Sequence, residues 1–363
     1  MRIVFSGGGT GGHIFPAVAV AQEVLRRYPD AEILFIGAKG KMEMTKVPKA
    51  GFDIKGLWIS GLQRKLTLRN ILFPIKLVWS LTSAYFILKR FKPHAAAGFG
   101  GYASGAALYM AALMKTPTLI QEQNSFPGIT NKILANRVRR IAIAYDKARQ
   151  YFPKEQTLLT GNPVRSQLLH RASKEQGIAH FNLDPKKKTV LIIGGSLGAR
   201  TLNRGIRDNH ESLRNYSDAQ FIWQCGQLYI DEYQSCESAQ LPHVHIMAFI
   251  DDMMMAYAAA DIVISRAGAL SVSELCIQQK STVLVPSPNV AEDHQTKNAM
   301  ALVENDAAVM IEDKSFSDSF LGVVQDLISD ADRRKLLEQN ISAMAHPKAV
   351  ELIADELITL AQG

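Results

Sequence analysis

The chain has 363 residues, of which 47% are hydrophobic and 21% are charged. This length exceeds that of one typical domain, about 100 to 200 residues, so two domains are expected, and the composition excludes wholesale disorder. The three cysteines, Cys225, Cys236 and Cys276, are too few for a disulfide framework and lack the spacing of a zinc site, which favours a reducing cytosol.

The net charge of +7 is distributed unevenly. Residues 1–164 carry 23 Lys and Arg against 8 Asp and Glu, a net +15, whereas residues 165–363 carry 18 against 26, a net −8. A basic half suggests a nucleic acid, an anionic membrane or a phosphorylated substrate as partner. Because the sequence has no nucleic-acid-binding motif and no interleaved aromatic residues, no nucleic acid is expected and the other two partners are favoured.

No targeting or membrane-spanning segment is expected. The chain passes from Met1 and Arg2 directly into an apolar strand without the features of a signal peptide, so secretion is not expected. The most apolar window, residues 71–91, contains Pro74 and three basic residues, which is not the pattern of a helix that crosses a bilayer. We therefore expect a protein that is soluble or lies on a membrane surface.

Short apolar runs alternate with helical patterns along the chain, which indicates an α/β fold with parallel sheets. In the first half, strands are expected near residues 3–6, 31–36, 53–59, 94–98, 117–121, 140–144 and 156–160. Helices are expected between them, near residues 14–28, 66–91, 104–114, 128–137 and 146–151.

The first strand runs into a glycine-rich turn with five glycines in positions 7–12. Glycines let backbone amides approach a ligand, and the N-terminus of the following helix favours an anion. The turn fits the dinucleotide-binding fingerprint, but the next strand ends in Gly37, Ala38 and Lys39, without the carboxylate that a dehydrogenase needs. A P-loop motif is absent as well. The turn is therefore another anion or close-approach site, or a helix-packing turn without a ligand.

The same opening recurs about half a chain later. The apolar run 189–193 leads into the glycine turn 194–199 and a helical pattern, which predicts a second Rossmann-like domain with its own anion-binding turn. The hinge is expected near residues 161–165, where glycine and proline interrupt a strand. A final helix near residues 349–361 could pack on either domain. Further strands are expected near residues 219–223, 261–265 and 281–285.

Polar residues follow several predicted strands, at the edge where open α/β sheets bind ligands. After strand 261–265, Glu274 could accept hydrogen bonds from both hydroxyls of a ribose, or could simply be a carboxylate near a helix N-terminus. Residues 293–295 offer a donor and an acceptor to sugar hydroxyls. In the first half, residues 121–124 and the turn 98–105 lie at the same kind of edge, although each alone could be an ordinary polar loop.

Taken together, six segments closely resemble the motifs of the MurG family, in order from residue 3 to about residue 300. Enzymes of this family move N-acetylglucosamine (GlcNAc) from UDP-GlcNAc onto lipid I, an undecaprenyl-pyrophosphoryl-MurNAc-peptide, to make lipid II for peptidoglycan. The resemblance implies that the chain is an N-acetylglucosaminyltransferase of this kind. The six segments are residues 8–13, 100–105, 122–124, 161–165, 194–199 and 265–274.

The resemblance also implies a fold and a division of roles. The implied fold is the α/β GT-B glycosyltransferase fold, with two Rossmann-like domains whose parallel sheets face an interdomain cleft. Residues 1–163 would bind the acceptor and associate with the membrane, and residues 164–345 would bind UDP-GlcNAc. Residues 346–363 would form a helix that can pack back on the N-terminal domain.

Individual positions match the family's binding residues. The phosphates of the donor would be bound by Ser196 and Arg165, the ribose by Glu274, and the uracil by the backbone of Ile250. The full set of donor positions implied by the resemblance is Thr10, Gly11, Gly12, Asn124, Arg165, Ser196, Ile250, Ala269, Leu270, Ser271, Val272, Ser273, Glu274 and Gln295. The implied acceptor positions are Gly101, Tyr102, Ser104 and Asn131.

The basic apolar stretch 66–91 is similar to the membrane-association patch of the family. Such a surface brings an enzyme to a lipid-linked substrate at an anionic membrane surface, although part of the stripe must be core. The implied location is peripheral, at the cytoplasmic face of the cell inner membrane. The apolar members of the stretch are Leu68, Ile71, Leu72, Phe73, Ile75, Leu77, Val78 and Trp79, and the basic members are Arg64, Lys65, Arg69 and Lys76.

The implied reaction is a single inverting displacement, in which the C4 hydroxyl of MurNAc attacks C1 of GlcNAc and UDP leaves. Neither a metal nor a cofactor is expected, because the sequence has no well-placed Asp-x-Asp motif; helix N-termini and Arg165 would stabilise the leaving group. His13 is the expected general base, because the positive end of a helix dipole favours neutral imidazole, and Glu122 is the reserve base. The alternative for His13 is a structural role as a helix cap.

Other functions are compatible with parts of the sequence. A UDP-GlcNAc 2-epimerase has two similar domains but needs no lipid acceptor, and a basic apolar patch would be unnecessary for it. A GT-B transferase with another lipid acceptor, or a non-catalytic subunit that binds a nucleotide sugar or a lipid, would share some of the same features.

Overall fold

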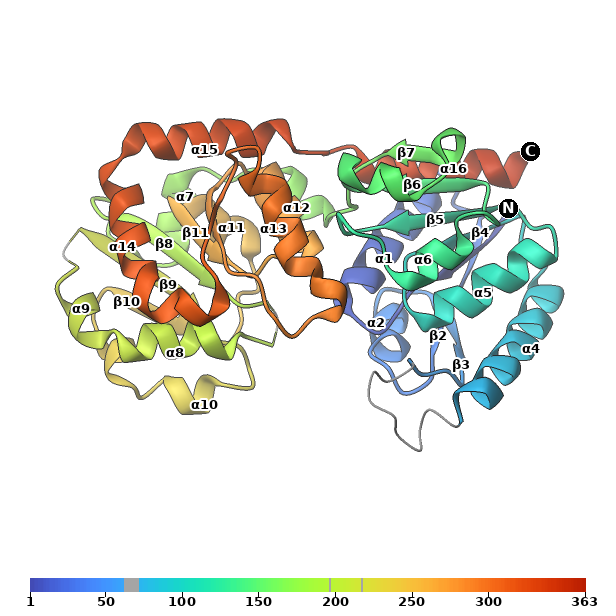
Figure 1. Ribbon diagram of the computed structural model, residues 1–363, viewed down its shortest axis with the longest axis horizontal. Helices are drawn as coiled ribbons and strands as arrows, with labels where there is room; N and C mark the ends of the chain where they lie inside the picture. Colours follow the sequence, from blue (N-terminus) through green and yellow to red (C-terminus); the bar gives the residue numbers. More distant parts are fainter. Residues whose placement is uncertain (62–71, 196, 217) are drawn as a thin grey trace. The chain divides into compact units, whose positions relative to one another are not determined.

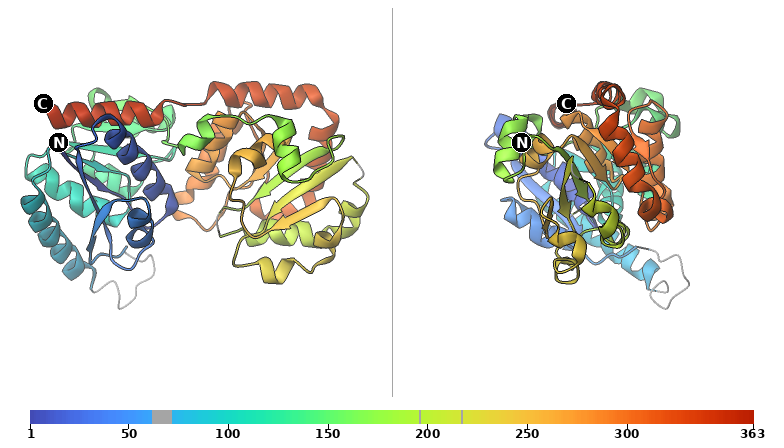
Figure 2. Two further views of the ribbon diagram at one scale, coloured as in Figure 1. Left: turned by 180° about the vertical axis from the view of Figure 1, so that it is seen from behind. Right: turned by 90° about the vertical axis from the view of Figure 1, so that its left-hand side faces the viewer.

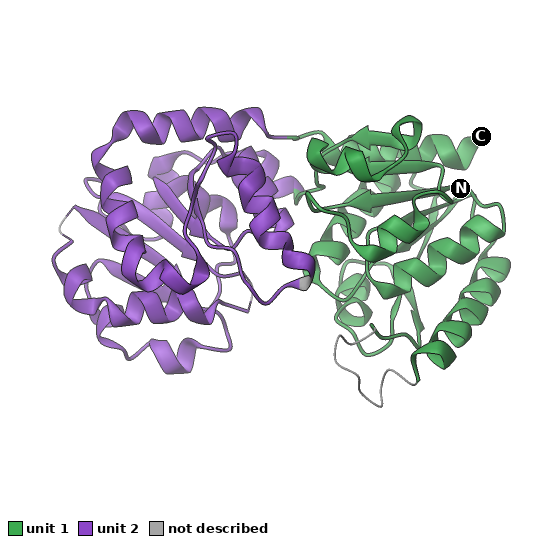
Figure 3. Ribbon diagram, in the orientation of Figure 1, with its two compact units in different colours: residues 1–165, 346–363 green, residues 166–345 purple. Residues whose placement is uncertain are grey.

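The computed structural model describes residues 1–61, 72–195, 197–216 and 218–363. The chain divides into two compact units (Figure 3). Unit 1 contains residues Met1–Arg165 together with His346–Gly363, and unit 2 contains residues Ser166–Ala345. Each unit is built around one parallel sheet.

In the described part of unit 1, seven strands form one sheet in the order β3-β2-β1-β4-β5-β6-β7, and all neighbouring strands are parallel (Figure 1). The order runs outward in both directions from β1 and β4, which is the doubly wound arrangement. The strands are β1 (Arg2–Ser6), β2 (Glu32–Ala38), β3 (Asp53–Leu57), β4 (Ala95–Gly98), β5 (Thr118–Glu122), β6 (Arg140–Ile143) and β7 (Thr157–Leu159).

Helices cover both faces of the unit 1 sheet, as a parallel sheet requires. Successive side chains of a strand point to opposite faces, so Ile3 and Phe5 join one buried cluster and Val4 joins the other. The first cluster includes side chains of α1, α2 and α16, and the second includes side chains of α4, α5 and α6. These helices are α1 (Gly11–Arg27), α2 (Glu43–Lys49), α4 (Phe73–Phe91), α5 (Tyr102–Leu113), α6 (Ile129–Leu134) and α16 (Ala349–Gln362).

The C-terminal helix α16 packs on unit 1, which the sequence alone did not determine. Its buried residues Ile353 and Leu357 join the same cluster as Ile3. The helix runs beside α1 (Figure 2), and Asp355 forms an ion pair with Arg27 of that helix. The chain therefore returns to its first unit after completing the second.

In the described part of unit 2, six parallel strands follow the order β10-β9-β8-β11-β12-β13, which repeats the doubly wound order of unit 1. The predicted second Rossmann-like domain is therefore present. The strands are β8 (Lys188–Ile193), β9 (Ala219–Gln224), β10 (Val244–Met247), β11 (Ile262–Ser265), β12 (Ser281–Leu284) and β13 (Val309–Met310).

Helices also cover both faces of the unit 2 sheet. On one face, Val190 and Ile192 of β8 belong to a cluster with Phe316 and Phe320 of α14. Elsewhere in the unit, α7 packs on α11, and α15 contacts β12 and α12. The helices are α7 (Lys174–His180), α8 (Arg200–Asp208), α9 (His210–Arg214), α10 (Ile230–Tyr233), α11 (Met253–Ala259), α12 (Ala269–Gln278), α13 (His294–Val303), α14 (Phe316–Ser329) and α15 (Ala331–Ala343).

The first helix begins earlier than predicted. α1 starts at Gly11 instead of Ile14, because Thr10 adopts the extended N-cap conformation and its carbonyl accepts hydrogen bonds from the amides of His13 and Ile14. Gly11, Gly12 and His13 therefore belong to the first helical turn. The helix predicted at residues 146–151 is present as a 3₁₀ helix.

Only residues 72–91 of the helix predicted at residues 66–91 are described. Residues 62–71 lie outside the described residues, and α4 begins at Phe73. Pro74 does not interrupt this helix, because in the first turn its missing N–H leaves no hydrogen bond unmade. None of the helices among the described residues is long and apolar enough to cross a membrane.

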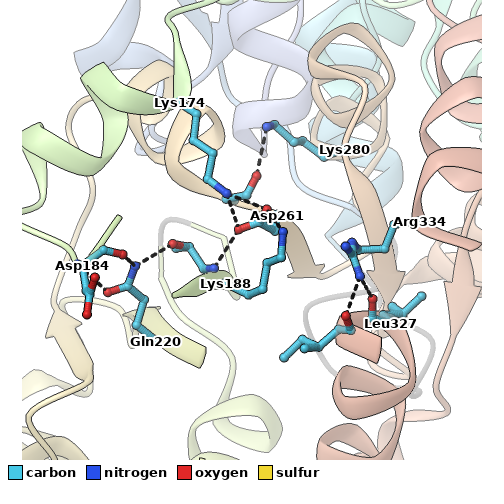
Figure 4. Close-up of polar contacts among 11 residues, drawn as sticks. Lys174, Asp184, Lys188, Gln220, Asp261, Lys280, Leu327 and Arg334 are labelled. Atoms are coloured by element: carbon cyan, nitrogen blue, oxygen red, sulfur yellow. Dashed lines mark hydrogen bonds and ion pairs between the residues drawn. The ribbon is translucent and has the colours of Figure 1, made fainter. Parts of the chain in front are cut away.

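A largely buried carboxylate, Asp261, lies at the amino edge of the unit 2 sheet (Figure 4). Lys174 Nζ lies 2.6 Å and Lys188 Nζ 3.4 Å from Asp261 Oδ1, and the Thr189 amide donates to Asp261 Oδ2 at 2.9 Å. Burial alone would raise the pKa of Asp261, but the bonds from Lys174 and Thr189 and the charges of both lysines lower it overall. The ion cluster thus joins α7, β8 and the start of β11.

We predict that Asp261→Asn lowers the free energy of unfolding by about 2 kcal/mol, because the two lysines lose a charged partner that is largely shielded from solvent. Since the pKa of Asp261 is lowered from 3.8 in the folded state, its stabilisation is present above about pH 4 and is lost as the pH falls below. Denaturant unfolding at pH 7 and pH 3 measures both effects. The control, Asp208→Asn in an exposed pair with Arg207, should change stability by less than about 0.5 kcal/mol. Equal losses from both substitutions would contradict the prediction.

Candidate active site

Strand order reverses at one place in each sheet. The reversal lies between β1 and β4 in unit 1 and between β8 and β11 in unit 2. Open parallel sheets bind ligands beyond the carboxyl ends of the strands at this point. The described parts of the turns singled out in the sequence lie there: residues 7–12 follow β1, residues 99–101 follow β4, residues 194–195 and 197–199 follow β8, and residues 266–268 follow β11.

In unit 1 the two glycine turns pack against each other through their backbones. The Gly8 N–H donates to the Gly100 carbonyl at 3.3 Å. A Cβ on Gly101, whose φ is +88°, would stand 2.5 Å from Gly8 O, and a Cβ on Gly100 would stand 2.9 Å from His13 Nε2. Both positions therefore need glycine, for backbone conformation and for space.

The His13 side chain projects from the first turn of α1 and is partly exposed. Its Nδ1 lies 2.8 Å from Gly8 O and 3.3 Å from Thr10 Oγ1. Because a carbonyl oxygen only accepts hydrogen bonds, Nδ1 carries the proton when the ring is neutral, and Nε2 is then the basic nitrogen. Nε2 makes no hydrogen bond with any of the residues described. The geometry suits a ring that accepts a proton at Nε2.

Glu43 is a residue that the sequence analysis missed. Its side chain is fully buried at the start of α2, where Oε2 accepts the Gly9 N–H at 3.0 Å and Oε1 accepts the Ala38 N–H at 2.9 Å. A dehydrogenase has a carboxylate after its second strand that binds a ribose. Here the carboxylate after β2, that of Glu43, instead accepts a hydrogen bond from the glycine turn. The only sequence signal is a single acidic residue among the four lysines of residues 39–49.

Glu122 is buried at the end of β5, and hydrogen bonds engage both of its oxygens. Oε1 accepts from the amide and side chain of Asn124 at 2.9 and 3.2 Å. Oε2 accepts from the Gly128 amide at 3.1 Å and from Asn131 Nδ2 at 2.8 Å. This arrangement fixes the loop after β5, including the predicted acceptor residue Asn131, and favours a positioning role for Glu122.

Three buried amide side chains connect neighbouring loops at the same edge. Gln121 Nε2 donates to Asn162 Oδ1 at 2.9 Å, and Asn162 Nδ2 donates to the Gln123 carbonyl at 3.0 Å. Gln123 Nε2 in turn donates to the Phe99 carbonyl at 2.8 Å. The network holds the turn after β4 and the segment after β7 in fixed positions relative to β5.

The predicted acceptor residues lie on the helices that follow β4 and β5. Tyr102 is half exposed, and a Cβ on Gly61 would overlap its ring. Ser104 Oγ and Asn131 Oδ1 are buried without a hydrogen-bond partner among the described residues. Buried polar atoms usually have partners, so the Ser104 hydroxyl is available to donate or accept a further hydrogen bond and Asn131 Oδ1 to accept one.

In unit 2, the glycine turn after β8 shares one backbone feature with the first turn. Gly195 has the same φ, +85°, as Gly9, and its carbonyl accepts a hydrogen bond from Gln224 Nε2 at 3.0 Å. A Cβ on Gly198 would overlap the Cys225 carbonyl, so the turn packs tightly on the end of β9. Ser196, the predicted phosphate contact, lies outside the described residues.

The turn after β11 leads into α12, which contains the predicted donor residues 269–274. Before it, Arg266 donates to the Val285 carbonyl at 2.9 Å and pairs with Asp313 at 2.5 Å, which fixes the turn. Glu274 lies in the second turn of α12, where the hydroxyl of the fully buried Tyr257 donates to its Oε2 at 3.2 Å. Tyr257 therefore orients the carboxylate predicted to bind the ribose.

The remaining predicted donor residues lie on different segments of the chain. Ile250 is buried just before α11. Gln295 is the second residue of α13, and its Oε1 accepts a hydrogen bond from the Ser287 amide at 2.8 Å. Arg165 is exposed and is the last residue of the first segment of unit 1.

No group of three or more His, Cys, Asp or Glu side chains among the described residues is arranged to hold a metal ion. The carboxyl edge of unit 2 instead offers an anion the N-termini of α8 and α12, each preceded by a turn that contains glycine. Helix N-termini carry partial positive charge and unpaired backbone N–H groups.

Comparison with known proteins shows which family has these features. Residues 3–143 and 189–356 match the N-terminal and C-terminal domains of glycosyltransferase family 28. The UDP-N-acetylglucosamine–N-acetylmuramyl-(pentapeptide) pyrophosphoryl-undecaprenol N-acetylglucosamine transferase of Phocaeicola vulgatus is 51% identical over 99% of this chain and 96% of its own length. The protein of the same name from Flavobacterium psychrophilum is 49% identical over 100% of this chain and 98% of its own length.

Two solved structures have a fold similar to that of this chain. MurG of Acinetobacter baumannii matches with a TM-score of 0.79 and 28% identity over 99% of both chains. UDP-GlcNAc 2-epimerase of Neisseria meningitidis matches with a TM-score of 0.66 over 99% of this chain and 100% of its own, but at 14% identity this likeness concerns the fold alone.

Two doubly wound α/β units with glycine turns at their strand-order reversals define a glycosyltransferase of the GT-B fold. The predicted fold class is confirmed. The chain belongs to glycosyltransferase family 28 and, within it, to the MurG family.

Proposed function

We propose that this chain transfers GlcNAc from UDP-GlcNAc to the C4 hydroxyl of MurNAc in lipid I and so makes lipid II for peptidoglycan synthesis. The observation that carries the proposal is the 51% identity, over 99% of the chain, to a relative named for this transfer. The fold supports it, because glycine turns at the strand-order reversals suit substrates that carry phosphate groups.

The donor would bind at the carboxyl edge of unit 2. Its diphosphate would lie at the N-termini of α8 and α12, and Glu274, oriented by Tyr257, would accept hydrogen bonds from the ribose hydroxyls. Ile250 would contact the uracil. The further donor contacts that we propose are Thr10, Gly11, Gly12, Asn124, Arg165, Ser196, residues 269–273 and Gln295.

The acceptor would bind at the carboxyl edge of unit 1. Gly101, Tyr102, Ser104 and Asn131 would contact lipid I. This placement is supported by the buried atoms Ser104 Oγ and Asn131 Oδ1, which have no hydrogen-bond partner in the described part of the chain. His13 would be the general base that takes the proton of the C4 hydroxyl at Nε2. Glu122 is the weaker candidate, because four hydrogen bonds hold its carboxylate in the loop after β5.

The outer face of α4 would place unit 1 on an anionic membrane surface. Ile75, Val78, Trp79 and Phe86 are all more than half exposed, whereas the opposite face of the helix is buried. Basic residues beside an apolar face favour the surface of an anionic bilayer. The protein would thus act peripherally at the cytoplasmic face of the inner membrane, and we propose no nucleic acid partner.

A UDP-GlcNAc 2-epimerase is the main rival, since it shares the fold. Incubation with radiolabelled UDP-GlcNAc, with and without lipid I, separates the two activities. The proposal predicts release of UDP and transfer of label to lipid only when lipid I is present. Formation of UDP-ManNAc without lipid I would identify an epimerase, and the absence of any turnover would identify a binding protein. Transfer only to a different lipid acceptor would show another GT-B specificity.

We predict that His13→Ala lowers kcat by about 10²-fold to 10⁴-fold, the usual contribution of a general base, while KM for UDP-GlcNAc changes less than about threefold. Steady-state kinetics with lipid I as acceptor measure both quantities. The control, His180→Ala at the exposed end of α7, should leave both values unchanged. A kcat near that of the unsubstituted protein would exclude His13 as the base.

We predict that Trp79→Ser weakens binding to anionic phospholipid vesicles by about 10-fold, because one large exposed apolar side chain is lost from the face that would insert. Vesicle co-sedimentation measures the change. Leu352→Ser, at an exposed apolar position on α16, is the matched control and should have no effect. Equal effects of both substitutions would mean that α4 is not the docking face.

A further inference from the structure

One peptide group connects Glu43 to His13. The Gly8 carbonyl oxygen lies 2.8 Å from His13 Nδ1, and the Gly9 N–H donates to Glu43 Oε2 at 3.0 Å. These two groups are the C=O and the N–H of the same peptide unit, which is trans. Because a trans peptide directs these groups in opposite directions, the carboxylate lies on one side of the peptide and the imidazole on the other.

The surroundings of Glu43 strengthen the interaction of its carboxylate with the Gly8–Gly9 peptide. The side chain is fully excluded from solvent. It accepts hydrogen bonds from the backbone amides of Gly9 and Ala38. A buried charge interacts more strongly with its neighbours than an exposed one, and hydrogen bonds in a chain polarise one another. The carboxylate therefore makes the Gly8 carbonyl a better acceptor for the proton on His13 Nδ1.

The glycine turn is shaped around this carboxylate. A Cβ on Gly8 would overlap Glu43 Oε1, and a Cβ on Gly37 would stand 2.6 Å from Glu43 Cγ. Two glycines from different segments thus leave the space that the side chain occupies. Because a larger residue at either position would collide with Glu43, the buried side chain and the two glycines form one packed unit.

We propose that Glu43 is a positioning residue for the general base. Through the Gly8–Gly9 peptide, its carboxylate holds His13 with the proton on Nδ1 and stabilises the imidazolium that forms when Nε2 takes the proton of the acceptor hydroxyl. The oxygen freed of that proton attacks C1 of GlcNAc as the bond to UDP breaks. The arrangement corresponds to the carboxylate behind the histidine of a catalytic triad, with a peptide group inserted between them. It rests on the proposed role of His13.

The test is Glu43→Gln, alone and combined with His13→Ala. The substitution removes the charge and leaves a side-chain amide facing a backbone donor, so kcat should fall about 10-fold to 100-fold, with KM for UDP-GlcNAc changed less than about threefold. Because Glu43 acts through His13, the double variant should have the same kcat as His13→Ala. The control, Glu32→Gln at the opposite end of β2, should be unaffected.

The outcomes separate this proposal from the one on which it rests. A normal kcat for His13→Ala would exclude His13 as base and with it the proposed role of Glu43. A low kcat for His13→Ala with a normal kcat for Glu43→Gln would exclude only the role of Glu43. If Glu43→Gln lowers kcat by the same factor in both backgrounds, Glu43 acts on the structure independently of His13, which would also overturn the proposal.

A second measurement needs no substitution at Glu43. The Gly9 residue is exposed, yet its N–H is bonded to a buried carboxylate. Amide hydrogen exchange in the unsubstituted protein should therefore be at least about 100-fold slower at Gly9 than in an unstructured chain, since exchange requires this bond to open. Exchange at the unstructured rate would show that the bond does not persist and would overturn the proposal even if Glu43→Gln does not fold.

Discussion

The buried carboxylate of Glu43 is the interaction on which the carboxyl edge of unit 1 depends. It accepts hydrogen bonds from the amides of Gly9 and Ala38. These two bonds join the turn after β1 to the end of β2. The turn after β4 packs directly on Gly8, so its position depends on the same contact. Leaving a buried amide without an acceptor costs roughly 1 to 3 kcal/mol, which makes the carboxylate hard to replace with an apolar residue.

In unit 2, other side chains hold the corresponding turn and the candidate ribose-binding carboxylate. A side-chain amide, Gln224, holds the turn after β8, and a tyrosine hydroxyl, Tyr257, orients Glu274. The charged cluster around Asp261 lies at the opposite, amino edge of this sheet, away from the predicted donor residues. The Asp261 cluster and the proposed donor contacts thus lie at opposite edges of the same sheet, so Asp261 can be substituted without touching the donor contacts that we propose.

Much of the fold followed from local patterns. Continuous apolar runs predicted the seven described strands of unit 1 and β8, β9, β11 and β12 of unit 2, because a parallel sheet is buried on both faces. The short edge strands β10 and β13 were not predicted. The start of α1 was misplaced, since the low helix propensity of Gly11 and Gly12 is overridden by the hydrogen bonds that Thr10 accepts. Helix α2 was not predicted, because seven residues that include Pro48 show no clear periodicity. The docking of α16 depends on contacts with α1 that no local pattern reveals.

The site was predictable where residue type and position in the turn determine the chemistry. His13 and Glu274 follow strand ends, and motif and spacing marked both. Glu43 could not be found in this way, because its partners are backbone amides in two other segments, and amides leave no sequence signal. The polar edge after β5 was noticed, but only the structure shows that the Glu122 carboxylate is engaged by its own loop.

The central claim is that the ring of His13 is held by the Gly8 carbonyl, so that Nε2 is the basic nitrogen. Nitrogen NMR of protein labelled with ¹⁵N-histidine reports the tautomer directly, and a His13→Gln sample identifies the signals of this ring. The account predicts a neutral form with the proton on Nδ1 and an unprotonated Nε2. A neutral form with the proton on Nε2 would contradict it.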